Sequence, residues 1–209
     1  GGNDGVMFKN GKWVINSKEN VATMTFLKKL TDQKLTQPNP AKCDRTACAQ
    51  TLFASGKAAF INGSVFLPGW LKDNGGAAIN LGSGSFVAAP GKKPVTLGVQ
   101  DYFTAYKANG HKAEIAKWMD FIFEPTNYAG FLKAAGGFIP ATKSAGANAA
   151  KDPKLAPFIK LLPSAIFYPG DQAAWPAIKG AIQQQVGTAL VNPKKTMDAL
   201  QAKANAAAK

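Results

Sequence analysis

Arginine and histidine are nearly absent from the sequence, although the chain is strongly basic. Arg45 is the only arginine among 25 lysine and arginine residues, His111 is the only histidine, and the formal net charge is +13. Proteins that read phosphates and bases favour arginine for its bidentate fork, and no helix-turn-helix, zinc-finger or RNA-platform motif is present. The lysines are spread along the chain in singles and short pairs, which indicates a solvated surface rather than a nucleic-acid or polyanion binder.

Long apolar runs are also lacking. No run approaches the roughly 18–20 residues that a membrane-spanning helix needs. The opening residues Gly1 to Asp4 have neither a basic start nor an apolar stretch, so we expect any targeting segment to lie outside this sequence. With 209 residues, 46% of them hydrophobic and 18% charged, the chain is expected to form one large globular domain or two small lobes.

The motifs of common enzymes are missing too. There is no G-x-S-x-G nucleophile elbow, no P-loop and no Rossmann fingerprint. His111 stands at the start of a predicted helix, where it is a solvated cap rather than a general base. A glycosidase needs two carboxylates roughly 5–9 Å apart, and only Asp101 has a suitable setting. We therefore predict that the protein is not an enzyme and uses neither a cofactor nor a metal.

Asp101 is unusual because Val99, Tyr102 and Phe103 flank it in a predicted strand over residues 95–106. A buried charge without a partner is costly. Two interpretations remain open. The carboxylate either bonds nearby backbone or a lysine, or it accepts hydrogen bonds from a polar ligand.

The chain has only two cysteines, Cys43 and Cys48, spaced C-x4-C. A four-ligand zinc site lacks the remaining ligands, and a redox C-x-x-C motif has a different spacing. We predict a local disulfide that closes the proline-rich loop, which implies an oxidising compartment. Two free thiols are the alternative.

Apolar periodicity, helix caps and glycine or proline stops predict helices alternating with few strands, the pattern of an α/β protein. The predicted helices cover residues 18–31, 44–56, 112–123, 127–135, 154–162, 175–190 and 194–206. The predicted strands cover residues 12–15, 58–61, 86–89 and 95–106, and the Ala/Gly/Asn-rich residues 142–152 are predicted to be a linker.

The four tryptophans fall into two groups. Trp13 and Trp118 lie on periodic elements and are expected in a core, whereas Trp70 and Trp175 lie at loop ends beside proline or glycine. A ring in a loop suits a sugar, because the apolar face of a pyranose stacks on it while planar polar groups take the hydroxyls. The alternative is that these two rings close the edge of a core.

The order of several short motifs along the whole chain resembles family 1 extracellular solute-binding proteins of ABC importers, which are maltose-binding-protein-like. In chain order the motifs are Gly1-Gly2 through Trp13, Phe26 to Leu30, Phe53, Gly56 to Ala59, Asn62-Gly63, Phe86 to Pro90, Ala116 to Phe123, Gly136 to Pro140, Trp175 and Met197 to Leu200.

The resemblance implies part of a two-lobed periplasmic-binding-protein fold of type II. Residues 1–96 would be a segment of the second lobe, residues 97–143 a hinge strand and helices that return to the first lobe, and residues 144–209 the C-terminal helices of the second lobe. Such proteins are usually near twice this length, so we expect the chain to be a C-terminal half. We expect the missing N-terminal half to cover strand edges and apolar faces that a lone half exposes.

The resemblance also implies a set of ligand-binding residues. Trp175 matches the stacking tryptophan at a helix start. Val65 stands where relatives usually offer a ring, so Phe66 or Trp70 would take that role. The full set is Gly63, Ser64, Phe66, Trp70, Gln100, Asp101, Tyr168, Asp171, Trp175 and Lys179.

The function implied is capture of a mono- or oligosaccharide in a cleft between two lobes and delivery to the permease subunits of an ABC importer. The protein would act outside the cytoplasm, in the periplasm or at the cell surface as a lipoprotein. A solute-binding protein for a polyol, an organic anion or a peptide is the main alternative, and Lys179 in the cleft would favour an anion. A basic polyanion binder or a glycosidase is less favoured.

Overall fold

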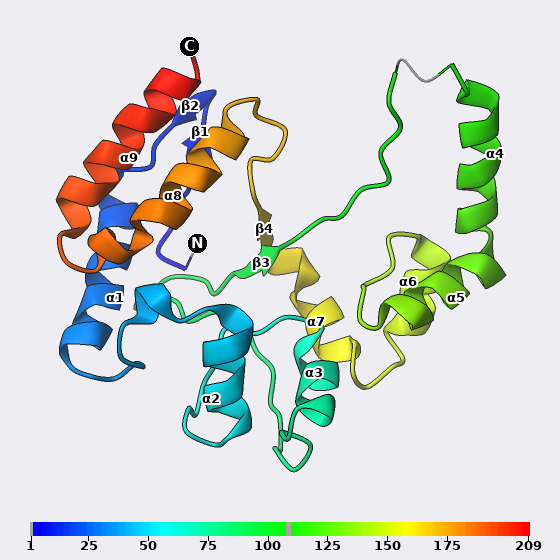
Figure 1. Cartoon of the computed structure of the whole chain (residues 1–209), viewed down its shortest axis with the longest axis horizontal. Helices are drawn as coiled ribbons and strands as arrows, with labels where there is room; N and C mark the ends of the chain where they lie inside the picture. Colours follow the sequence, from blue (N-terminus) through cyan, green and yellow to red (C-terminus); the bar gives the residue numbers. More distant parts are fainter. Residues whose placement is uncertain (1, 108–109) are drawn as a thin grey trace. The chain divides into compact units, whose positions relative to one another are not determined.

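A computed structural model of the chain describes residues 2–107 and 110–209 (Figure 1). The chain divides into two compact units, each assembled from separated segments. The first unit combines Gly1–Ala49, Ser85–Gly98 and Ser164–Lys209, and the second combines Gln50–Gly84 and Val99–Pro163. Among the described residues, no helix is both long enough and apolar enough to cross a membrane.

The first unit begins with a hairpin that leads into a long helix. Strands β1 (Phe8–Lys9) and β2 (Lys12–Trp13) pair antiparallel, with Phe8 opposite Trp13. Asn10 and Gly11 turn the chain at φ values of 51° and 73°, the left-handed pair that a tight hairpin requires. Helix α1 (Lys18–Asp32) follows the N-cap Ser17, whose hydroxyl accepts the Asn20 N–H. The predicted helix is confirmed, and the predicted strand is shorter than expected.

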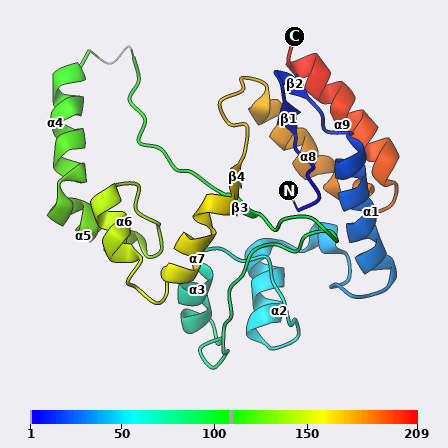
Figure 2. The ribbon, with the colours of Figure 1, turned by 180° about the vertical axis from the view of Figure 1, so that it is seen from behind.

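Two helices, α8 (Trp175–Ala189) and α9 (Pro193–Ala207), lie side by side and hold the core of the first unit (Figures 1 and 2). The core consists of Trp13, Ile15, Ala174, Trp175, Ile178, Ala181, Met197, Leu200 and Ala204. Strand β3 (Thr96–Gly98) pairs parallel with β4 (Ala165–Phe167) in the same unit. Both predicted helices are confirmed within one residue at each end.

The predicted disulfide between Cys43 and Cys48 is present. It follows the 3₁₀ turn η1 (Pro40–Lys42) and encloses most of the π-helical turn η2 (Arg45–Gln50), which continues into α2 (Thr51–Ala54). A single helix was expected over this stretch. The short disulfide-closed loop instead carries wider π-helical turns, and the stop at Gly56 (φ 71°) is as predicted.

Reducing this disulfide is expected to lower the free energy of unfolding of the first unit by about 2 kcal/mol, because the bridge restricts a short loop in the unfolded chain. Urea denaturation followed by circular dichroism, with and without a thiol reductant, measures the change. The double variant Cys43→Ser/Cys48→Ser serves as control, since its stability should not respond to the reductant. A reduced protein as stable as the oxidised one would contradict the prediction.

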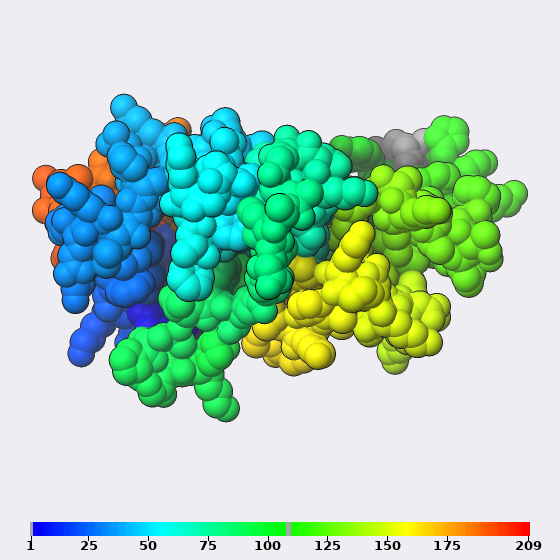
Figure 3. Space-filling model, turned by 90° about the horizontal axis from the view of Figure 1, so that it is seen from below, coloured from blue at the N-terminus to red at the C-terminus, as the bar shows by residue number. Residues whose placement is uncertain are grey.

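In the described residues of the second unit, all the regular elements are helices. Helix α3 (Leu67–Asp73) packs beside α2 through Phe53, Leu67 and Leu71 (Figure 3). The other elements are α4 (Lys112–Phe123), α5 (Pro125–Ala135), α6 (Lys143–Ala149), α7 (Ala156–Leu161) and the 3₁₀ turn η3 (Leu162–Ser164) at the unit boundary. Glu124 caps α5 by accepting the N–H groups of Thr126 and Asn127.

Several local predictions were wrong. Within the described residues, the stretches 58–61 and 86–89 form no strand, and only Thr96–Gly98 does so within residues 95–106. Residues 86–89 have isolated bonds in place of a ladder, from Phe86 N–H to Val95 and from Ala89 N–H to Gly2. The expected linker contains α6, because alanine is the strongest helix former. Trp118 is 48% exposed rather than buried in a core.

Candidate ligand-binding site

The predicted ligand-binding residues fall into two sets, one in each unit. Tyr168, Asp171, Trp175 and Lys179 belong to the first unit. Gly63, Ser64, Phe66, Trp70, Gln100 and Asp101 belong to the second. Each set has its own local geometry.

In the first unit, a row of aromatic rings leads from the core to the surface. Trp175, the first residue of α8, is 9% exposed. The Trp13 ring lies 6.3 Å from it at an interplanar angle of 7°, and the Tyr168 ring lies 5.4 Å from it at 27°. The ring of Phe8 continues the row, with its centroid 4.9 Å from that of Trp13. Because Tyr168 is 44% exposed, it is the outer ring of the row.

The loop that carries Tyr168 and leads into Trp175 is closed by its own hydrogen bonds. Gln172 N–H donates to Pro169 at 3.1 Å, and Trp175 N–H donates to Gln172 at 2.8 Å. The Gln172 amide donates to the Asp171 carboxylate at 2.9 Å. Asp171 and Lys179 are both exposed. This loop and the start of α8 therefore offer one exposed ring, that of Tyr168, together with the Asp171 carboxylate, the Gln172 amide and the Lys179 ammonium group, which suits a polar ligand.

In the second unit, the residues after Asn62-Gly63 enter α3 rather than an aromatic loop. The Ser64 carbonyl accepts the Leu67 N–H at 2.9 Å, and a side chain on Gly63 would meet Leu67 at 2.6 Å. Trp70 packs against the small core of this unit. Phe66 is 41% exposed and meets Phe138 edge-on at 5.2 Å. Of the two alternative rings, Phe66 is therefore the more accessible.

Gln100 and Asp101 lie on the extended segment that follows β3. The Tyr102 hydroxyl donates to the Gln100 side chain at 2.8 Å. Asp101 is exposed, so the expectation of a carboxylate in a buried strand was wrong. Its apolar neighbours Tyr102 and Val99 are themselves exposed, at 76% and 66%.

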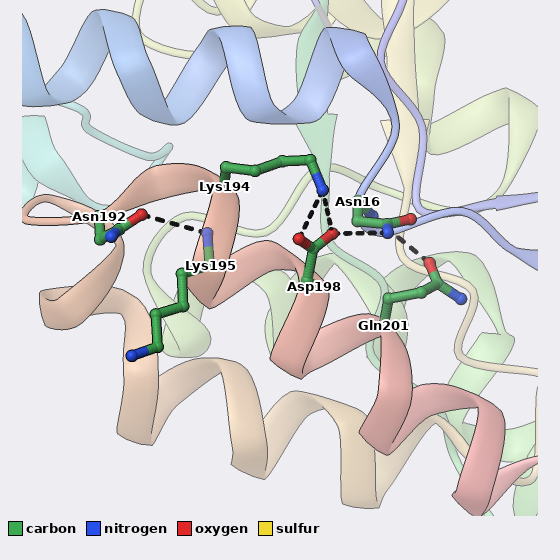
Figure 4. A network of polar contacts seen from close by, with 6 residues as sticks. All are labelled: Asn16, Asn192, Lys194, Lys195, Asp198 and Gln201. Carbon is green, nitrogen blue, oxygen red and sulfur yellow. Dashed lines mark hydrogen bonds and ion pairs between the residues drawn. The ribbon is translucent and has the colours of Figure 1, made fainter.

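A polar network that the sequence analysis missed joins the loop after the hairpin to α9 (Figure 4). Asn16 donates to Asp198 at 2.8 Å, and Lys194 donates to the same carboxylate at 2.6 Å. The hydrogen bond from Lys194 and, to a smaller extent, the hydrogen bond from Asn16 hold the pKa of Asp198 below its usual value. Gln201 donates to the Trp13 carbonyl at 2.9 Å. The i,i+4 spacing of Lys194 and Asp198 is the sequence signal that could have revealed it.

An open pocket of about 640 Å³ lies beside this network. Its lining includes Lys12, Asn16, Ser17 and Gln201 but none of the predicted ligand residues. The Gln201 amide already donates to the Trp13 carbonyl and to Asn205. We therefore infer that the role of the network is to hold the hairpin against α9.

The helix-rich α/β architecture with small two-stranded sheets is that of part of a periplasmic-binding-protein fold. A solved structure that shows it is the maltose-bound MalE3 of T. maritima, with a TM-score of 0.71 and 22% sequence identity. The match covers 99% of this chain and 54% of that chain, so this chain spans about half the length of MalE3. Neither a protein-family model nor a curated protein matches the sequence.

Proposed function

We propose that this chain is part of an extracytoplasmic solute-binding protein that captures a mono- or oligosaccharide. The observation that carries the proposal is the likeness over 99% of the chain to a structure described as maltose-bound. The sugar would be held in a cleft between two lobes and passed to the permease subunits of an ABC importer. Closure around the ligand would trap it and mark the loaded form for the permease, so the mechanism is binding rather than catalysis.

The half-length match supports a second part of the proposal, that an N-terminal half of the same protein completes the fold. In that complete fold, residues 97–143 would cross to the first lobe, and residues 1–96 and 144–209 would build the second lobe. These two proposed lobes have other bounds than the two compact units described above. Large apolar side chains in the crossing region are exposed, with Tyr106 at 80% and Phe121 at 61%. Apolar surface of this extent favours a partner, and we propose that the N-terminal half covers it.

The proposed ligand contacts divide by chemistry. Aromatic rings would stack on the apolar face of a pyranose, and planar polar or charged groups would bind its hydroxyls. The stacking rings are Phe66, Trp70 and Trp175, and Tyr168 lies against Trp175 at the same place. The polar contacts are Gly63, Ser64, Gln100, Asp101, Asp171 and Lys179.

A non-sugar ligand is the second candidate, and Lys179 is the observation that favours it. Lys179 lies four residues after Trp175 on α8 and is exposed. Residues four apart are neighbours on a helix surface, so a cation stands beside the ring. This pairing would suit an organic anion as well as a sugar.

The test uses a protein that contains this chain together with the N-terminal half we propose. Calorimetric titration of this protein with neutral sugars and with organic anions shows which of the two ligand classes binds. Neutral oligosaccharides are expected to bind, and Trp175→Phe is expected to weaken that binding by about 1 kcal/mol, or roughly fivefold, because the smaller ring stacks less well. Phenylalanine is chosen over alanine because Trp175 is buried. The control Trp118→Phe should leave affinity unchanged.

Two results would contradict the proposal. Binding of an organic anion without any binding of neutral sugars would replace the sugar with the anion. If Trp175→Phe binds neutral sugars as tightly as the parent protein, Trp175 does not contact the ligand.

A further inference from the structure

We propose that Tyr168 covers the ring face of Trp175 in the ligand-free protein and that a bound sugar displaces it. Tyr168 would then set the affinity of the site by competing with the ligand. This inference rests on the proposed function for the identity of the ligand, but the covering contact itself rests on the geometry of the first unit alone.

Trp175 is held firmly from the core side. Its ring lies nearly parallel to that of Trp13, at 6.3 Å and 7°, and Trp13 is only 7% exposed. Ile178, one turn further along α8, is 1% exposed. Trp175 therefore has a fixed orientation, which is the property that a stacking platform needs.

Tyr168 stacks on the same ring and is much more exposed than Trp175. The two rings are 5.4 Å apart, and Trp175 keeps 9% of its surface exposed while Tyr168 keeps 44%. Within the described residues, no hydrogen bond of the Tyr168 hydroxyl is found. Gly170 follows two residues later, and the Gly170 N–H donates to the Tyr168 carbonyl at 2.8 Å. The tyrosine ring is thus held by stacking, on a short glycine-containing loop.

The strength of this contact fixes how much affinity it removes. An aromatic pair of this kind corresponds to an equilibrium constant of roughly 2–12 in favour of the stacked state. The competent fraction is then about one third to one thirteenth, and the apparent affinity falls by the same factor. A sugar that stacks on Trp175 and also binds polar groups outcompetes the tyrosine, so occlusion tunes binding without abolishing it.

Two measurements test the proposal. The first is fluorescence quenching of the protein with the substitutions Trp70→Phe and Trp118→Phe, which leave Trp13 and Trp175 as the tryptophans of this chain. Without ligand, Tyr168→Ala is expected to increase acrylamide quenching of tryptophan fluorescence, while Tyr168→Phe leaves it unchanged. The second measurement is calorimetric titration with maltose and longer neutral oligosaccharides, using the protein with all its tryptophans. Tyr168→Ala is expected to lower Kd about threefold to thirteenfold, and Tyr168→Phe, which keeps the competing ring, to lower it by less.

The outcomes separate this inference from the proposed function. Weaker sugar binding in Tyr168→Ala would make Tyr168 the platform itself and overturn the inference. Unchanged quenching would show that Tyr168 does not cover Trp175 and would also overturn it. Increased quenching with no sugar bound by any variant would support the covering contact while overturning the sugar as its competitor.

Discussion

Replacing Trp13 with alanine is expected to lower the free energy of unfolding of the first unit by about 3–5 kcal/mol, the cost of deleting a large buried ring. Trp13 is 7% exposed and packs against both Phe8 and Trp175. It also pairs with Phe8 across the hairpin, and its carbonyl accepts the Gln201 amide. The cavity would thus open where the hairpin, α8 and α9 meet, and the neighbouring backbone is held too firmly to fill it.

Urea denaturation followed by far-ultraviolet circular dichroism measures this effect, with the two units treated as separate transitions if they do not unfold together. Trp118→Ala is the matched control. Trp118 is 48% exposed and meets Phe103 edge-on at 5.3 Å, so its loss should cost about 1 kcal/mol. Equal losses in both variants would mean that Trp13 is not part of the core.

The long helices could be predicted from the sequence because their signals are local, whereas the short helices α3 and α6 were missed. Helix α4 has the predicted bounds, Lys112–Phe123, since apolar periodicity gives its body and Glu124-Pro125 gives its end. The disulfide was also local, since its two cysteines lie close in sequence. Both features depend on residues within a few turns of one another.

The strands could not be predicted in the same way. Strand β3 pairs with β4, which lies beyond α4, α5, α6 and α7 in the sequence. Apolar stretches such as 58–61 have strand composition, but a strand is defined by its ladder partner, and in the described chain these stretches have none.

The candidate site shows the same division. The proline and glycine context singled out Trp175, but its burial depends on rings at positions 13 and 168, which only the tertiary structure joins. Phe66 and Trp70 could not be told apart in sequence, but in the structure Trp70 packs against the small core of the second unit while Phe66 is 41% exposed. Asp101 was misjudged because apolar neighbours predict burial only when something covers them.

Replacing Gly137 with alanine is expected to lower the free energy of unfolding of the second unit by about 2–4 kcal/mol. Gly137 has a φ of 146°, a region that a side chain disfavours by about 1–3 kcal/mol. An added Cβ would also lie 2.9 Å from the Phe66 ring. The ring would have to move and would lose its edge-on contact with Phe138, adding about 1 kcal/mol or more.

Gly130→Ala is the control, because it adds the same methyl group a few residues away, and the expected change in stability has the opposite sign. Gly130 lies inside α5, and an added Cβ there meets nothing within 4 Å. Alanine should therefore raise the stability by about 0.5–1 kcal/mol, since it restricts the unfolded chain and favours the helix.

The midpoints of thermal denaturation of the two variants measure both effects. If both shift the midpoint upward, Gly137 is not required for its φ, and the turn that positions Phe66 tolerates a side chain. A fall for Gly137→Ala alone would show that the Gly136-Gly137 turn fixes where Phe66 stands, and with it the accessible ring of the second unit.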